Sequence, residues 1–179
     1  MDQTKIRFDK KRLADTLFDL LEDEELDEIS VEDLCEAADL EYHTFYVYYS
    51  DLDDVFEEYK CEVYNEVSQA LSLTNSDLGN ILDVFDRTMA NNFKGFCQLC
   101  LYKKHYDLTD KLQRKLFTEL EAALLVNQTS ANDQLVLQYL SSGLINSYIY
   151  WFEHPQNFNY QALRIINRQI IQSNLAMIR

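Results

Sequence analysis

Glycine and proline, the residues that most often end or bend a helix, are scarce in this chain, which has three glycines and one proline in 179 residues. An average protein of this length would hold about four times as many glycines. Long segments also place apolar residues three and four positions apart, which is the period of a helix that buries one face. The sequence therefore predicts an all-α fold, and its 47% hydrophobic content indicates a globular one.

The N-terminal part predicts three helices in a compact arrangement. Apolar positions indicate a first helix from about Phe8 to Leu21, and an acidic connection follows it. Ser30, with Asp33 three residues later, is typical of a helix N-cap and predicts a second, short helix. A third short helix is expected over Tyr42–Tyr48.

The rest of the chain predicts a longer helical domain. Ser50 with Asp53 repeats the capping pattern and is expected to open a long helix, so we divide the chain into domains at 1–50 and 51–179. A polar run over Asn127–Asp133 predicts a loop. Helical patterns fill the remainder and are expected from Asp77, around Phe96–Tyr106, and over Leu108–Val126, Gln134–Phe152 and Tyr160–Met177.

The last two helical segments carry more apolar surface than one core-facing stripe can absorb. Helices that are apolar on more than one face are usually buried on more than one face. This pattern predicts a subunit interface, most simply a symmetric four-helix bundle formed by two chains. The side chains expected at this interface are Leu140, Leu144, Tyr148, Trp151, Ile166 and Ile170.

A series of motifs in the first sixty residues follows a recognisable order. After the apolar first helix come ISVEDLCEAADL, the triplet Thr44, Phe45 and Tyr46, and then Tyr48 and Tyr49 ahead of a capped helix. These residues resemble the helix-turn-helix domain of the TetR family of bacterial regulators. The resemblance implies a three-helix N-terminal domain, joined by a long helix to a C-terminal bundle that dimerises and often holds a small-molecule inducer.

The resemblance also implies which residues contact DNA. It makes Tyr42–Tyr48 a recognition helix that enters the major groove of a palindromic operator, with Phe45 packing inward. The side chains expected to contact bases or phosphates are Tyr42, His43, Thr44, Tyr46 and Tyr48. Lys5, Lys10 and Lys11 belong to a basic cluster that is expected to reach the DNA backbone or minor groove as an N-terminal arm does, or else to form a solvated start to the first helix.

The charge of the same region opposes DNA binding. The chain has a net charge of −15, and residues 1–60 contain 20 of its 31 acidic residues. No Lys or Arg lies between Arg12 and Lys60. The chain also departs from the family pattern, because Asp39 stands where Gly is common in the turn and Leu52 stands where a phosphate-binding Lys is usual. Since DNA affinity depends largely on cations that displace counterions, we expect weak and salt-sensitive DNA binding.

Two other functions stay open at this point. The acidic N-terminal domain could have lost operator binding and instead engage a basic protein surface, because opposite charges speed association. Alternatively, the aromatic C-terminal part could hold a small molecule without any DNA output, although aromatic residues at helical spacing are also typical of a core. The leading interpretation is a homodimeric transcriptional regulator.

Other classes of function find little support in the sequence. It contains no Gly-rich phosphate loop, nucleophile arrangement or cluster of metal ligands, so we expect no enzyme activity, no cofactor and no metal. Cys97 and Cys100 form a single C-x-x-C, which suits half a metal site, a redox pair, or two small buried residues on one helix face. No signal peptide or membrane span is recognisable, so a cytoplasmic protein that does not contact membranes is expected.

Overall fold

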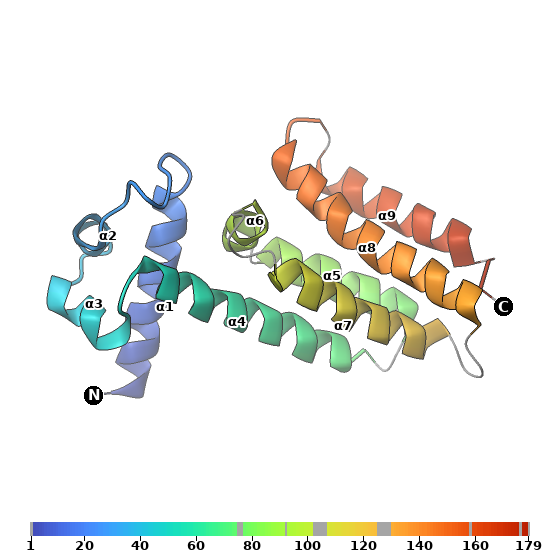
Figure 1. The fold of residues 1–179 in the computed structure, drawn as a ribbon, viewed down its shortest axis with the longest axis horizontal. Coiled ribbons are helices and arrows are strands. Elements are labelled where there is room, and N and C mark those ends of the chain that lie inside the picture. Colours follow the sequence, from blue (N-terminus) through green and yellow to red (C-terminus); the bar gives the residue numbers. More distant parts are fainter. Residues whose placement is uncertain are drawn as a thin grey trace.

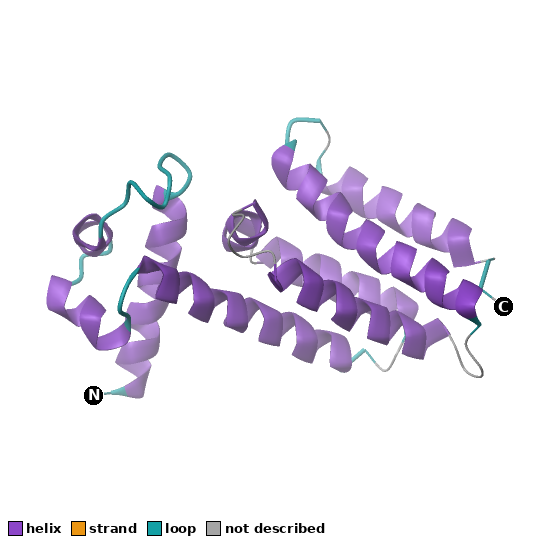
Figure 2. Ribbon diagram, viewed as in Figure 1, coloured by secondary structure: helices purple, strands orange, loops and turns teal. Residues whose placement is uncertain are grey.

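The computed structural model describes residues 2–74, 77–91, 93–101, 107–124, 130–157, 159–175 and 177–178. Within these ranges every regular element is a helix (Figure 2), and the all-α prediction is confirmed. Figure 1 labels the helices α1 (Gln3–Leu20), α2 (Val31–Ala37), α3 (Tyr42–Tyr48), α4 (Leu52–Ser72), α5 (Leu78–Asn91), α6 (Phe93–Leu101), α7 (Asp107–Leu124), α8 (Ala131–Glu153) and α9 (Tyr160–Leu175).

Helix α1 begins earlier than the apolar pattern predicts. Asp2 caps it, because its side chain accepts a hydrogen bond from the backbone N–H of Thr4 at 3.0 Å. The predicted start at Phe8 is therefore wrong, and the basic cluster from Lys5 to Arg12 lies within α1 instead of forming a separate arm. Apolar periodicity could not find this start, since α1 carries no buried apolar residue before Leu13.

The caps of the next helices agree with the sequence in one case and differ in the other. Ser30 and Asp33 form the expected capping box, with each side chain accepting the other residue's backbone N–H at 3.1 Å. The long helix is instead capped by Asp51, whose carboxylate accepts the N–H of Asp54 at 3.0 Å. The predicted cap at Ser50 is wrong by one residue, and its backbone N–H donates to Asp54 at 2.7 Å.

The helices form two connected groups along α4, as Figure 1 shows. Helices α1, α2 and α3 surround the N-terminal end of α4, while α5, α7 and the antiparallel pair α8 and α9 stack beside the rest of it. Buried leucines recur every fourth residue on α7, at Leu108, Leu112, Leu116 and Leu120. This spacing keeps one face of α7 against its neighbours, and α7 packs most extensively on α8.

Helix α8 starts before the sequence pattern indicated. Ser130 and Asp133 form a second capping box, so the helix begins at Ala131 and Asp133 lies in its first turn. The predicted loop over Asn127–Asp133 is wrong at its C-terminal end, while its residues 127–129 lie outside the described part of the chain. None of the described helices is both long enough and apolar enough to cross a bilayer.

Helix α6 joins the two groups of helices. Lys94 forms ion pairs with Asp19 at 2.7 Å and Glu22 at 2.9 Å, at the C-terminal end of α1. Gln98 donates to the backbone oxygen of Leu21 at 3.1 Å. Gly95 allows α6 to approach α4 closely, because a Cβ atom at this position would lie 2.3 Å from the hydroxyl oxygen of Tyr59. The position of the α1–α3 group is therefore tied to the bundle.

Candidate nucleic-acid interface

The turn between α2 and α3 is held by an arginine from α1. Asp39 adopts a left-handed backbone with φ of 48°, a conformation that Asp tolerates better than most side chains. The guanidinium of Arg12 donates to the backbone oxygens of Ala38 and Asp39, and it also lies 3.5 Å from the Asp39 carboxylate. Sequence reasoning missed this role, because no local pattern connects a residue of the first helix with a turn 26 residues later.

Helix α3 separates a buried anchor from an exposed aromatic face. Phe45 is fully buried and fixes the helix against the core. On the outer face, Tyr42, Tyr46 and Val47 are 47%, 48% and 61% exposed. The rings of Tyr42 and Tyr46 pack edge to face with centroids 5.0 Å apart, and their hydroxyl oxygens lie 3.0 Å from each other. This hydrogen bond raises the pKa of Tyr42, so its hydroxyl stays neutral at physiological pH.

Two of the other residues expected to contact DNA are less accessible. Tyr48 is half-buried, and its hydroxyl donates to the carboxylate of Asp9 on α1 at 3.0 Å. Burial, together with this contact, raises the pKa of Tyr48. Thr44 is also half-buried, whereas His43 is exposed. The Tyr48 hydroxyl therefore links α3 to α1 through a hydrogen bond. To donate to a DNA phosphate it would have to break that bond.

The basic side chains of α1 are largely engaged within the protein. Lys10 binds the Glu58 carboxylate at 2.7 and 2.9 Å and lies over the ring of Tyr49, 4.9 Å from its centroid. Lys11 pairs with Asp15 at 3.1 Å, one turn along the same helix. Lys5 is exposed in the first turn of α1. Of the three lysines expected to contact DNA, two thus have acidic partners in the chain itself.

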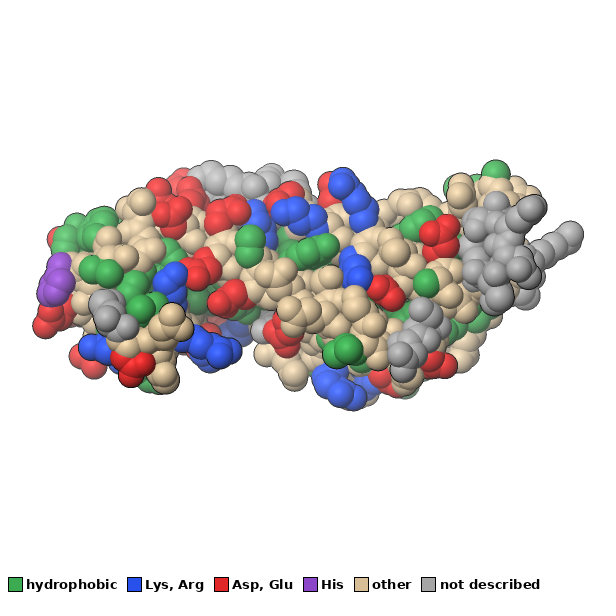
Figure 3. Space-filling model, turned by 90° about the horizontal axis from the view of Figure 1, so that it is seen from below, with side chains coloured by type: hydrophobic (Ala, Val, Ile, Leu, Met, Phe, Trp, Pro, Cys, Tyr) green, Lys and Arg blue, Asp and Glu red, His purple; other side chains and the backbone are tan. Residues whose placement is uncertain are grey.

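Acidic side chains flank the exposed face of α3. Asp39 and Glu41 precede the helix and are exposed, as are Glu32 and Glu36 on α2. The carboxylate of Glu41 lies 3.2 Å from Nε2 of His43, which would be attracted to it when protonated. Figure 3 shows acidic, histidine and hydrophobic side chains gathered at the outer tip of the α2–α3 end. This surface presents a negative rim around an aromatic centre.

A second exposed surface lies on α8 and α9, the outermost pair of helices in Figure 1. Apolar side chains on α8 and α9 are between 45% and 70% exposed; they are Leu135, Tyr139, Tyr150, Ile165, Ile166 and Ile170. A Cβ atom at Gly143, between them on α8, would meet no atom within 4 Å. No charged residue occurs from Gln134 to Phe152. We call this surface the α8–α9 face.

The residues expected at a dimer interface need correction. Leu140, Leu144 and Tyr148 are 1%, 4% and 1% exposed and lie inside the protomer, so they cannot contribute area to a contact with a second copy. Trp151 is half-buried beside Phe93, with ring centroids 5.1 Å apart. Ile166 and Ile170 do lie on the α8–α9 face. Apolar periodicity identified the helices correctly, but it could not assign the two apolar sides of α8 to inside and outside.

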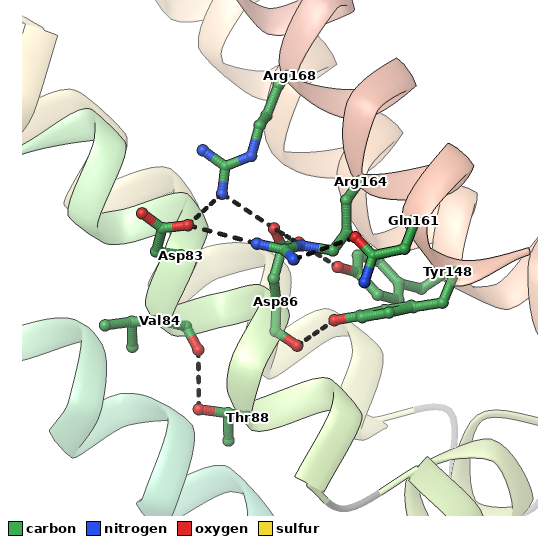
Figure 4. Close-up of polar contacts among 9 residues, drawn as sticks. Asp83, Val84, Asp86, Thr88, Tyr148, Gln161, Arg164 and Arg168 are labelled. Carbon is green, nitrogen blue, oxygen red and sulfur yellow. Dashed lines mark hydrogen bonds and ion pairs between the residues drawn. The ribbon is translucent and has the colours of Figure 1, made fainter.

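A polar cluster in the bundle interior ties α9 to α5 and α8 (Figure 4). The carboxylate of Asp86 is buried, and it accepts from the Tyr148 hydroxyl, from Arg164 at 2.9 Å and from Arg168 at 3.1 Å. Arg168 also pairs with Asp83 at 2.6 Å. Burial and the nearby Asp86 carboxylate raise the pKa of Tyr148, which keeps its hydroxyl protonated and donating. We call these residues the Asp86 cluster.

The aromatic residues considered for a ligand pocket differ in their burial. Among them, Phe85, Phe96 and Tyr148 are fully buried in the core. Phe117 lines a surface groove of about 490 Å³ between α7 and α8. Tyr102 and Tyr106 lie outside the described residues.

The C-x-x-C pair lies on α6. Cys100 is buried and Cys97 is half-buried, and burial raises the pKa of Cys97 to about 11. Among the residues that the structure describes, no group of three or more His, Cys, Asp or Glu side chains is placed to hold a metal ion.

Comparison with known proteins identifies the fold. The chain matches no family model and no curated protein sequence. Among solved structures, it is similar to the dihydroxyacetone kinase operon activator DhaS, with a TM-score of 0.71 at 12% identity over 96% of this chain and 98% of that one. It is also similar to a TetR-family transcriptional regulator from Streptomyces coelicolor, with a TM-score of 0.69 at 16% identity over 94% and 81%. The chain therefore has a TetR-like fold.

Proposed function

We propose that this protein with a TetR-like fold is a homodimeric transcriptional regulator. The main support is that one chain has both a helix-turn-helix at its N-terminal end and an exposed apolar face, on α8 and α9, at its other end. Both structural neighbours are described as regulators of transcription, one of them an operon activator. In this proposal the N-terminal domain, residues 1–50, makes the output contact, and residues 51–179 dimerise.

Dimerisation is proposed to use the α8–α9 face. Its six exposed apolar side chains lie on two adjacent antiparallel helices, so pairing with the same face of a second copy would build a four-helix bundle. Burying them removes apolar surface from water, which stabilises the pair. Sedimentation equilibrium tests this: a concentration-independent monomer would contradict the homodimer.

The output contact is proposed to be DNA, approached by α3. Tyr42, His43 and Tyr46 are exposed there and offer hydrogen-bond groups to bases or phosphates. Because Lys10 and Lys11 already have acidic partners and the rim of α3 is acidic, we expect low affinity that falls steeply with salt. A selection of genomic fragments by the purified protein across a salt series should enrich one palindrome at low salt. Enrichment of no sequence at any salt would argue against DNA contact.

A second function for the same domain is supported by the contacts that its Lys and Arg side chains make inside the protein. Lys10 and Arg12 are both used inside the protein, one on Glu58 and one on the α2–α3 turn. The exposed side of α3 is aromatic, and exposed acidic residues lie on α2 and in the turn before α3. This charge is complementary to a basic protein surface. We propose this as the alternative in which operator binding has been lost and regulation acts through a protein partner. Small-molecule control through the C-terminal part is a further expectation that the sequence suggests.

A further inference from the structure

We infer that the outer face of α3 is a docking surface for a protein segment rich in Lys or Arg. The inference deepens the alternative above, on which it rests, by naming the contact residues and the chemistry of the partner. Its centre is the pair Tyr42 and Tyr46, which contact each other, and Val47 is also exposed on the same short helix. We call these three residues the aromatic face of α3.

The aromatic face is already ordered for contact. The edge-to-face packing of the two rings and the hydrogen bond between their hydroxyls restrict both side chains before any partner arrives. Side chains that are held in this way lose less conformational freedom on binding. The face of a tyrosine ring attracts ammonium and guanidinium groups, because its π electrons concentrate negative charge there. The exposed Val47 adds an apolar area that aliphatic side chains of a partner would cover.

The rim of the aromatic face selects for positive charge. This rim consists of four exposed acidic residues that precede the aromatic face in the chain: Glu32 and Glu36 on α2, Asp39 in the turn and Glu41 at the N-cap of α3. Asp39 lies 3.5 Å from the guanidinium of Arg12, and its side chain is still fully exposed. Glu41 lies 3.2 Å from Nε2 of His43, and both of these side chains are 77% exposed. A basic segment would find opposite charge at this rim, whereas a DNA phosphate would meet like charge. The sign of the charge therefore favours a basic protein segment over DNA.

A direct binding measurement tests the inference with a defined probe. A fluorescein-labelled amphipathic peptide of leucine and lysine is titrated with the full-length protein at physiological salt, and its anisotropy is followed. Tyr42→Ala with Tyr46→Ala should weaken binding about tenfold, from the loss of two exposed cation–π contacts. Tyr42→Phe with Tyr46→Phe keeps the rings and should stay within about twofold of the parent. Leu73→Ala, at an exposed apolar position at the end of α4, is the control.

The charge of the rim is tested separately from total charge. Glu36→Gln with Glu41→Gln changes the net charge by the same amount as Asp23→Asn with Glu24→Gln, which lie in the exposed turn after α1. Only the first pair should weaken peptide binding by more than about threefold, because charges beyond a Debye length of about 8 Å are screened. All substituted positions are exposed, and unchanged helical circular dichroism confirms folding of each variant.

Two results would overturn the inference. One is equal affinity of the parent and the double alanine variant; the other is equal loss in the two charge pairs, which would mean that the peptide follows net charge alone. The parent failing to bind the peptide while genomic selection enriches a palindrome would likewise overturn it and leave the DNA-binding regulator standing. A monomer in sedimentation, with the peptide still bound through α3, would overturn the homodimer but support the docking surface.

Discussion

Replacing Asp86 by alanine should destabilise the protein far more than replacing its neighbour Asp83. Asp86 is the buried acceptor at the centre of the Asp86 cluster, with 5% of its side chain exposed, whereas 51% of the Asp83 side chain is exposed. Without Asp86, the Tyr148 hydroxyl is left in the core without this acceptor, and two arginines lose a carboxylate. The two substitutions delete the same chemical group at two depths.

The magnitude follows from what each substitution leaves behind. Removing one partner of a buried ion pair costs about 3–5 kcal/mol. Arg164 and Arg168 retain Asp83 and remain about 30% exposed to water, so the expected loss for Asp86→Ala lies lower, at about 2–3 kcal/mol. Asp83→Ala breaks only exposed pairs and should cost less than about 1 kcal/mol. Tyr148→Phe removes one hydroxyl and should cost about 1 kcal/mol.

Urea unfolding followed by circular dichroism measures these differences. A chain of this size has an m-value of about 2–3 kcal/mol/M, so Asp86→Ala should lower the urea midpoint by about 1 M at unchanged m. All variants are compared at one protomer concentration, because the stability of a dimer depends on concentration. Equal midpoint shifts for Asp86→Ala and Asp83→Ala would refute the reasoning, since burial of the carboxylate would then have no effect on how much it stabilises the protein.

Three further predictions concern the dimer face, the thiols and the acid range. Ile170→Asp should convert the dimer to a folded monomer in sedimentation, while Leu73→Asp should not, because only the first lies on the α8–α9 face. With burial raising the pKa of Cys97 to about 11, iodoacetamide at pH 8 should alkylate the exposed Cys61 well before Cys97, as read by mass spectrometry. Hydrogen bonds from Ser30 lower the pKa of Asp33, so its contribution to stability is present above the unfolded pKa of about 3.9 and is lost as the pH falls through the lower folded value. Asp33→Asn should therefore reduce the acid-side decline of the urea midpoint below about pH 4.

Local patterns predicted those features of the fold that are decided locally. The helical period gave the all-α class, and the range Tyr42–Tyr48 for α3 agrees with the structure. The Ser30–Asp33 capping box was recognisable because a serine and an acid three residues apart can satisfy each other's backbone within one turn. The start of α1 was missed, since its cap Asp2 precedes turns that carry no buried apolar residue.

Contacts between distant residues were beyond these patterns. The basic cluster of α1 suggested phosphate binding, but Lys10 meets Glu58 only after α1 crosses α4. Similarly, the apolar residues of α8 lie on two sides of the helix, and the packing of neighbouring helices decides that Tyr148 is inside and Tyr139 outside. The Asp86 cluster joins three helices from separate parts of the sequence, so no spacing rule points to it.

The contacts of Arg12 explain how the N-terminal domain keeps a helix-turn-helix shape although its surface charge is unfavourable for DNA. A helix C-terminus carries partial negative charge, and Asp39 adds a carboxylate just after the end of α2. The guanidinium of Arg12 offsets both by binding the carbonyls of Ala38 and Asp39. A guanidinium held on the turn in this way has fewer N–H groups left for a phosphate, and the nearby Asp39 carboxylate offsets its charge. Arg12 thus holds the acidic turn in the helix-turn-helix geometry. The α3 surface that results is better matched to a positively charged partner than to DNA.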